Sequence, residues 1–239
     1  GDISRGHQPG TSAGDISRPR RRGRRGTRSR SGALDPGNYS VPETVPDGWD
    51  LTEAICDDDD GTDPASIVLD AGENVTCDFT NTARGNIVIV KQTDPDGSTD
   101  TFSFSPSYGA PFDLTDGQSN DSGPLVPGIF SVSETVPGGW DLIESVCSDG
   151  SDVSAIDVGP GETVTCVFTN QQDANIIVFK VTYPAGDPQL FDFVSDFAGN
   201  FQLADGQSNN SGDLDPGTYS VSETVPTGWQ LTSASCTAG

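Results

Sequence analysis

Short runs in which apolar and polar residues alternate recur along most of the chain. Residues 101–105 (TFSFS) and 163–170 (TVTCVFTN) alternate in this way, and residues 86–91 (NIVIVK) form a β-branched run typical of a buried strand. Turn signals rich in Gly, Pro and Asp separate the runs, and none of them has the spacing of an amphipathic helix. The pattern therefore predicts an all-β protein built from short strands.

One box of sequence occurs three times and sets the period of the chain. It reads SVPETVPDGWDL at residues 40–51, SVSETVPGGWDL at 131–142 and SVSETVPTGWQL at 220–231. The glutamates of the box are 91 and 89 residues apart. A fixed period of this size predicts an array of small domains, each built from one repeat.

The repeats divide the chain into one complete unit and two partial ones. Residues 86–171 contain about seven predicted strands, which is typical of a small antiparallel β-sandwich. Residues 33–83 match only the second half of this unit, and residues 175–239 lack its last strand. The links between units are very short, which favours a stiff rod over a flexible string.

The net charge of -24 is divided unevenly along the chain. Residues 1–30 hold nine Arg and two Asp, whereas residues 31–239 hold three basic and 34 acidic side chains. The acidic part is a poor partner for nucleic acid or for an anionic membrane, and we expect no nucleic-acid partner. No apolar run reaches the roughly 20 residues of a membrane span. Residues 1–32 have three interpretations: a disordered basic arm, a polyanion contact, or a non-native stretch, because they do not match the repeat.

The cysteines fall at matched places in the repeats. Cys56 and Cys77 in the first unit correspond to Cys147 and Cys166 in the second, while Cys236 stands alone in the third. We expect one disulfide in each of the first two units and an unpaired Cys236. Buried free thiols are the alternative. A zinc site is not expected, since the chain has no CxxC motif and one histidine.

Three polar residues of the complete unit share strand faces with apolar residues. By strand parity, Lys91, Glu134 and Asn170 point toward the core. Burial raises the pKa of a Glu and lowers that of a Lys, so a neutral amine would stand beside a protonated carboxyl. This trio is equipped to expel ammonia and form a Lys–Asn isopeptide bond in a single self-modification. The alternative is structural: Glu134 accepts backbone hydrogen bonds, while Lys91 and Asn170 lie at solvated strand ends.

The order of these residues resembles a known family. Lys in the first strand, Glu in an ETVPxGW box and Asn at the end of GETVTCxFTN are similar to the prealbumin-like repeat domains of bacterial surface proteins, the SpaA-like and collagen-adhesin B-type modules. The resemblance covers residues 33–239 and implies tandem transthyretin-like β-sandwiches that form stalks. It assigns Glu134 as the catalyst of a bond between Lys91 and Asn170. Trp in place of the usual Tyr and the cysteine pairs depart from the pattern.

The resemblance also marks equivalent positions in the partial repeats. The first repeat has the Glu and the Asn but no Lys, and the third has the Lys and the Glu but no Asn. These residues are Glu43, Asn81, Lys180 and Glu223.

The expected function is structural. We expect stalk or spacer repeats of a secreted or cell-surface adhesin-like protein, not an enzyme, without a cofactor and with an unknown surface or matrix ligand. Two alternatives remain: a module that binds a matrix or carbohydrate ligand, or an accessory domain of a secreted hydrolase. Unpaired strand edges in the incomplete repeats predict self-association.

Overall fold

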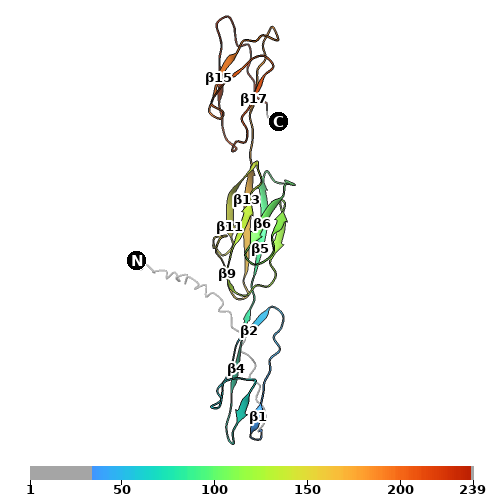
Figure 1. Ribbon diagram of the computed structural model, residues 1–239, viewed down its shortest axis with the longest axis vertical. Coiled ribbons are helices and arrows are strands. Elements are labelled where there is room, and N and C mark those ends of the chain that lie inside the picture. Colours follow the sequence, from blue (N-terminus) through green and yellow to red (C-terminus); the bar gives the residue numbers. More distant parts are fainter. Residues whose placement is uncertain (1–33, 238–239) are drawn as a thin grey trace, which may run out of the picture. The chain divides into compact units, whose positions relative to one another are not determined.

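The computed structural model describes residues 34–237, and the segment 1–32 lies outside them. The described part of the chain consists of β-strands joined by turns, without helices (Figure 1). It divides into two compact units. One reaches to Val45 and includes Leu51–Asn81, and the other consists of Pro46–Asp50 and the chain from Thr82 onward. The all-β class predicted from the alternating pattern is confirmed.

The first repeat forms two small sheets. β1 (Gly37–Tyr39) pairs with β3 (Ile67–Leu69), and β2 (Trp49–Cys56) pairs with β4 (Cys77–Ala83). Both sheets are two-stranded, so each strand keeps a free edge among the described residues. Few side chains of this repeat are buried as a result.

The second repeat contains the largest core. Its strands are β5 (Asn86–Asp94), β6 (Phe102–Pro106), β7 (Phe112–Leu114), β8 (Ser119–Asp121), β9 (Gly128–Phe130), β10 (Val132–Thr135), β11 (Trp140–Cys147), β12 (Ile156–Val158) and β13 (Thr163–Gln172). They form a four-stranded sheet in the order β11-β13-β5-β8, a three-stranded sheet in the order β10-β6-β7 and a pair, β12-β9. The sheets enclose one core, as in a β-sandwich.

Strand parity explains which residues fill this core. Ile87 and Ile89 of β5, Phe102 and Phe104 of β6, and Phe168 of β13 are almost fully buried. The residues between them on each strand are more exposed, because successive side chains of a strand point to opposite faces. The predicted faces of residues 86–91, 101–105 and 163–170 are therefore confirmed.

The structure corrects the expected antiparallel pairing and adds two details of the strands. β5 and β13, the first and last strands, pair in parallel, which is possible because the rest of the repeat forms the long connection that a parallel pair requires. The polar stretch 112–123 contains a further strand, β8, which pairs with β5. Residues 128–136 form two strands: the chain leaves the β12-β9 pair at Ser131 and joins β6 as β10.

The third repeat has a smaller core. β14 (Ile177–Phe179) pairs with β17 (Ser208–Asn210), while β16 (Asn200–Leu203), β15 (Phe191–Ser195) and β18 (Val221–Thr224) form a sheet. Phe191, Phe193 and Leu203 make up its buried cluster. β14 pairs with β17 along one edge only. Its other edge has no partner among the described strands, whereas the corresponding edge of β5 in the second repeat pairs with β13.

Candidate functional site

The second repeat brings Lys91, Glu134 and Asn170 together inside its core. Lys91 lies on β5 and Asn170 on β13, adjacent strands of one sheet, and Glu134 lies on β10 of the opposite sheet. Lys91 and Asn170 are 0% exposed, and so is the side chain of Glu134. Three polar groups from both layers of the sandwich thus share a site that excludes water.

Distances show how closely these groups approach one another. Lys91 Nζ lies 2.6 Å from Asn170 Oδ1 and 3.5 Å from Glu134 Oε1. The same amine donates to the carbonyl oxygens of Gln92, at 2.6 Å, and Phe168, at 3.3 Å. An ammonium has three N–H donors, so these two carbonyls and the Asn170 amide use all of them.

The acceptors and donors of the other two residues are less well satisfied. Both carboxyl oxygens of Glu134 and Nδ2 of Asn170 are buried and have no well-formed hydrogen bond within residues 34–237. A buried group without any partner costs about 1–3 kcal/mol of stability. Here the ion pair of Glu134 with Lys91 and the proximity of Asn170 offset part of that cost. A folded protein rarely leaves three of them within one site, which marks the site as one with a role beyond packing.

Burial dominates the acid–base balance of the site. It raises the pKa of Glu134 above its usual value, although the charge of Lys91 and the proximity of Asn170 oppose the shift. It lowers the pKa of Lys91, opposed by Glu134 and, more weakly, by Asp116. Both directions favour the neutral forms, an amine with a free lone pair and a carboxyl that holds a proton.

An aromatic pair covers the amine, and sequence reasoning did not identify it. The ring of Phe102 lies 4.1 Å from Lys91 Nζ, and Trp140 meets that ring edge-on at 5.3 Å. Trp140 is held in turn by a hydrogen bond from its Nε1 to Asp100, 2.9 Å long. The recurrence of the Trp in all three boxes was the available signal, but it gave no contact partner.

Asp116 is a second residue of the site's surroundings that sequence reasoning missed. Its two carboxylate oxygens accept hydrogen bonds from the backbone N–H of Thr93, at 2.7 Å, and of Gly97, at 2.8 Å. These bonds lower its pKa, the one from Gly97 most. In the third repeat Asp205 binds the backbone of Thr182 and Gly186 in the same way, so the recurring DGQSN sequence was the signal.

The partial repeats each bring two of the three polar groups together. In the third repeat Lys180 Nζ lies 2.8 Å from Glu223 Oε1 and 3.9 Å from the ring centre of Phe191. In the first repeat Asn81 Nδ2 donates to Glu43 Oε1 at 2.6 Å. The chain has no other lysine than Lys91 and Lys180, so the first repeat contains no partner amine of its own.

Two disulfides are present, as the matched cysteines predict. Cys56 is bonded to Cys77 and Cys147 to Cys166, whereas Cys236 is free and exposed. The bonds close loops of 21 and 19 residues. Each stabilises its repeat by about 3 kcal/mol in the chain-entropy account.

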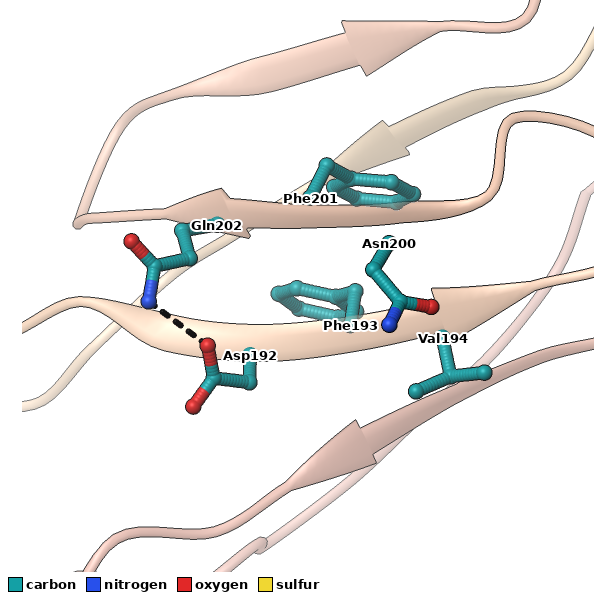
Figure 2. A pocket seen from close by; sticks show the side chains of 6 residues that line it. All are labelled: Asp192, Phe193, Val194, Asn200, Phe201 and Gln202. Atoms are coloured by element: carbon teal, nitrogen blue, oxygen red, sulfur yellow. Dashed lines mark hydrogen bonds between the residues drawn. The ribbon is translucent and has the colours of Figure 1, made fainter.

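A surface depression of 490 Å³ lies over β15 and β16 of the third repeat (Figure 2). Its lining includes the stacked rings of Phe193 and Phe201, whose centres are 5.3 Å apart. The one carboxylate of the lining, Asp192, accepts a hydrogen bond from Gln202 at 2.6 Å. The depression therefore lacks the converging titratable groups of a catalytic site.

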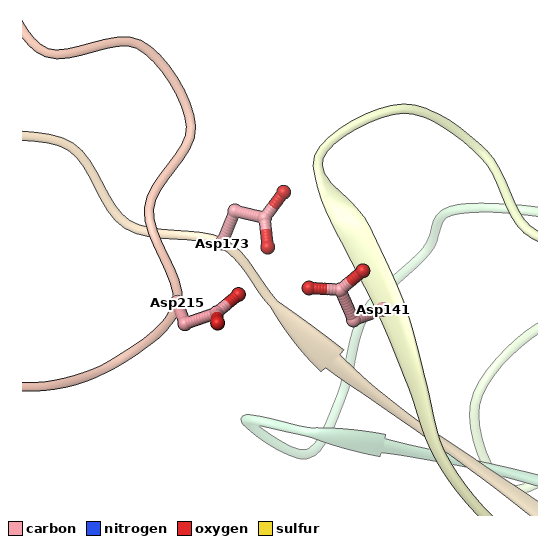
Figure 3. Close-up of side chains that lie close together, drawn as sticks. All are labelled: Asp141, Asp173 and Asp215. Atoms are coloured by element: carbon pink, nitrogen blue, oxygen red, sulfur yellow. The ribbon is translucent and has the colours of Figure 1, made fainter.

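Three acidic side chains converge near the start of the third repeat. Carboxylate oxygens of Asp141, Asp173 and Asp215 lie within 4.8 Å of one another, and the side chains point toward a common centre (Figure 3). At the corresponding place between the first two repeats, Asp50 forms an ion pair with Arg84 at 2.7 Å. Exposed carboxylates are common on an acidic surface, and we assign no metal to this group.

Comparisons with known proteins identify the kind of domain. Residues 14–83 match a SpaA-type family described as a prealbumin-like fold domain. The resemblance inferred from the ETVPxGW box is therefore confirmed for this segment, and with it the prealbumin-like β-sandwich fold. A domain of this type is a module of bacterial surface proteins. The match begins within the basic segment 1–32, whose interpretation stays untested.

Two further comparisons do not assign a function to the chain. The solved structure of the Bacillus anthracis TIE protein is similar at 22% identity and a TM-score of 0.37, over 70% of this chain and 34% of that one. This chain thus spans about a third of the length of that protein. A comparison with curated proteins gave no match. In the described range no helix has the length and apolar character needed to cross a membrane.

Proposed function

We propose that the chain is part of an extracellular stalk whose second repeat is locked by an isopeptide bond between Lys91 and Asn170. The observation that supports this proposal is the approach of Lys91 Nζ to Asn170 Oδ1 at 2.6 Å, beside Glu134 and without exposure to water. The disulfides favour an oxidising, extracellular location. The reaction occurs once per molecule, so the module is not an enzyme.

The reaction begins with a proton transfer inside the buried pair. Lys91 gives one proton to the carboxylate of Glu134, which leaves a neutral amine and a carboxylic acid. The raised pKa of Glu134 and the lowered pKa of Lys91 both favour this transfer. The amine lone pair then attacks Cγ of Asn170, while the Glu134 acid donates its proton to Oδ1 of the same amide.

The second half of the reaction releases ammonia. Glu134 takes back the proton from Oδ1 and relays one from Lys91 Nζ to Nδ2 of Asn170, so the Cγ–Nδ2 bond breaks as the carbonyl reforms. One Nζ–Cγ bond is formed, one Cγ–Nδ2 bond is broken, and one ammonia leaves. No oxidant or cofactor is required. Glu134 acts as the proton carrier throughout and ends as the carboxylic acid, holding the proton that Lys91 gave it at the start.

The position of the bond explains its mechanical value. β5 and β13 are the first and last strands of the repeat, so tension applied at its two ends enters near Asn86 and leaves beyond Asn170. A covalent bond from Lys91 to Asn170 would carry that tension directly. Residues 92–169, which make up most of the sandwich, would then stay folded under load.

A tryptic digest tests this proposal. Within residues 31–239 the basic residues are Arg84, Lys91 and Lys180, and trypsin cleaves after Lys91 only while its amine is free. After reduction and denaturation, a cross-linked chain yields one peptide of residues 85–180, lighter by one ammonia. A chain without the bond yields residues 85–91 and 92–180 instead. An Asn170→Ala chain is the control for that second pattern.

A further inference from the structure

The reactive asparagine shares its strand with a disulfide. Cys166 and Asn170 lie four residues apart on β13, and both point into the core with no exposed surface. Cys166 faces Cys147 directly in the β11–β13 ladder, where the two are bonded. Along β5, Cys166 is paired with Ile89 and Phe168 with Lys91. The disulfide is therefore the covalent point of attachment nearest to the Lys91–Asn170 contact.

The backbone ladder beside Asn170 is irregular. Asn170 pairs with Leu142 and Thr169 with Glu144, so the register of β11 shifts by one residue at this point. A slip of one residue turns every side chain of a strand to the opposite face. Because the β11–β13 ladder tolerates this shift, it does not by itself fix the register of β13 beside Asn170. On the other side of β13, the regular parallel pairs with β5 also hold Asn170 toward the core. The bond at Cys166 excludes such a slip in β13.

The first repeat contains the asparagine and the glutamate of the site without the lysine. In the first repeat the Cys56–Cys77 bond joins β2 to β4, and Asn81, four residues after Cys77, contacts Glu43 at 2.6 Å. This contact exists although that repeat has no lysine. Within the described residues, a disulfide-bonded strand pair thus presents its asparagine to the glutamate in a repeat that has no lysine.

We propose that the Cys147–Cys166 disulfide positions Asn170 for attack by Lys91, so that oxidation of this cysteine pair sets the rate of isopeptide formation. This inference rests on the proposed function. Two thiols are oxidised by exchange with a small-molecule disulfide, which is reduced to two thiols. The amide exchange that follows releases ammonia and involves no redox change. A reduced chain therefore stays free of the cross-link longer than an oxidised one.

The experiment follows ammonia loss during refolding of the full chain. A Cys236→Ser background prevents wrong pairing in all samples. The chain is recovered unfolded and reduced, and is then diluted into buffer with either oxidised or reduced glutathione. Timed samples are reduced, alkylated and weighed. Rates are taken only after Trp140 fluorescence has become constant, with Trp49→Phe and Trp229→Phe in the background, so that folding and chemistry are read separately.

We expect ammonia loss to be faster by about tenfold or more with oxidised glutathione, since small misplacements of reacting groups cost this much or more. Cys56→Ser/Cys77→Ser, the matched change in the first repeat, should keep this dependence. Cys147→Ser/Cys166→Ser should lose it and react at the slow rate in both buffers.

Equal rates for the unsubstituted cysteines in the two buffers would overturn the inference, and so would fast ammonia loss from Cys147→Ser/Cys166→Ser. If that variant does not fold, the comparison of the two buffers in the presence of all four cysteines decides the question. A complete absence of ammonia loss from every sample would instead refute the proposed function, and the inference with it. The two failures are therefore distinguishable.

Discussion

Lys91 and Asn170, which are 79 residues apart in the sequence, meet in the core with Nζ 2.6 Å from Oδ1. The parallel pairing of β5 and β13 makes this contact possible. It aligns Phe168 with Lys91, and Asn170 follows two residues after Phe168 on the same face of the sheet. A polar contact in such a dry position is costly unless it serves a reaction or a network.

Replacing Phe102 by Leu should slow the cross-linking reaction. The ring covers Lys91 Nζ at 4.1 Å, and a smaller side chain would admit water and move the pKa of Lys91 back toward its usual value. We expect the rate of ammonia loss to fall by about tenfold. This is a small part of the rate enhancement that general acid–base catalysis usually supplies. The matched change Phe191→Leu in the third repeat should leave the rate unchanged. Equal rates for both variants would contradict the assigned role of Phe102.

Removing one partner of the buried pair should destabilise the second repeat more than removing both. Lys91→Met leaves the Glu134 carboxyl buried without its cation, which costs about 3–5 kcal/mol at neutral pH. Lys91→Met/Glu134→Met removes the uncompensated group and should recover most of this loss. Urea unfolding followed by Trp140 fluorescence, in a chain with Trp49→Phe and Trp229→Phe, measures the difference. Both variants lack the cross-link, so a lower stability of the double variant would contradict the pairing.

The pH dependence of stability should show a minimum when the bond cannot form. In an Asn170→Ala chain the pKa of Glu134 is raised in the folded state, so stability present below about pH 4.5 is lost as the pH rises through the folded value. The pKa of Lys91 is lowered in the folded state, so stability is regained as the pH approaches 10.5. Between these two pH ranges the buried Glu134 and Lys91 would both carry a charge, so the free energy of unfolding is lowest there.

The same Trp140 unfolding assay at a series of pH values checks this prediction. Adding Lys91→Met and Glu134→Met to the Asn170→Ala chain removes both titrating groups and should flatten the minimum. A minimum of equal depth in that control would assign the effect to other carboxylates of this acidic chain.

The sequence predicted the faces of the strands better than their pairing. Alternation placed Phe102, Phe104 and Phe168 in one core, and the structure buries them there. Alternation carries no information on strand direction, so the parallel β5–β13 pair and the break at Ser131 could not be read from it. Both depend on contacts between segments far apart in the chain.

For the candidate site, too, the sequence predicted which side chains point inward but not which other residues they contact. Parity predicted that Lys91, Glu134 and Asn170 point inward, and the structure places them together, while their reaction stays a prediction. The roles of Phe102 and Asp116 were not foreseen, because each depends on a tertiary contact with the Lys91 strand. Recurrence of the Trp and of DGQSN marked the segments but not their partners.

The open edge of β14 should make the chain self-associate. Ile177, Phe179 and Val181 are 60%, 62% and 67% exposed, and an apolar strand with a free edge invites pairing with another strand. Sedimentation velocity should show reversible oligomers that grow with concentration. Ile177→Lys/Phe179→Lys should sediment as a monomer, whereas Val126→Lys, at an exposed site away from this edge, should behave like the parent. A parent chain that stays monomeric at all concentrations would contradict the prediction.

The central claim is the covalent bond, and the intact mass of the full chain tests it most directly. The chain is weighed after reduction and denaturation, beside a Glu134→Ala chain and a Glu223→Ala chain as matched control. The account predicts a deficit of one ammonia in the parent and in Glu223→Ala, and the full calculated mass in Glu134→Ala, which lacks the proton carrier. A parent chain with its full calculated mass would contradict the account and leave Lys91, Glu134 and Asn170 as a buried structural network.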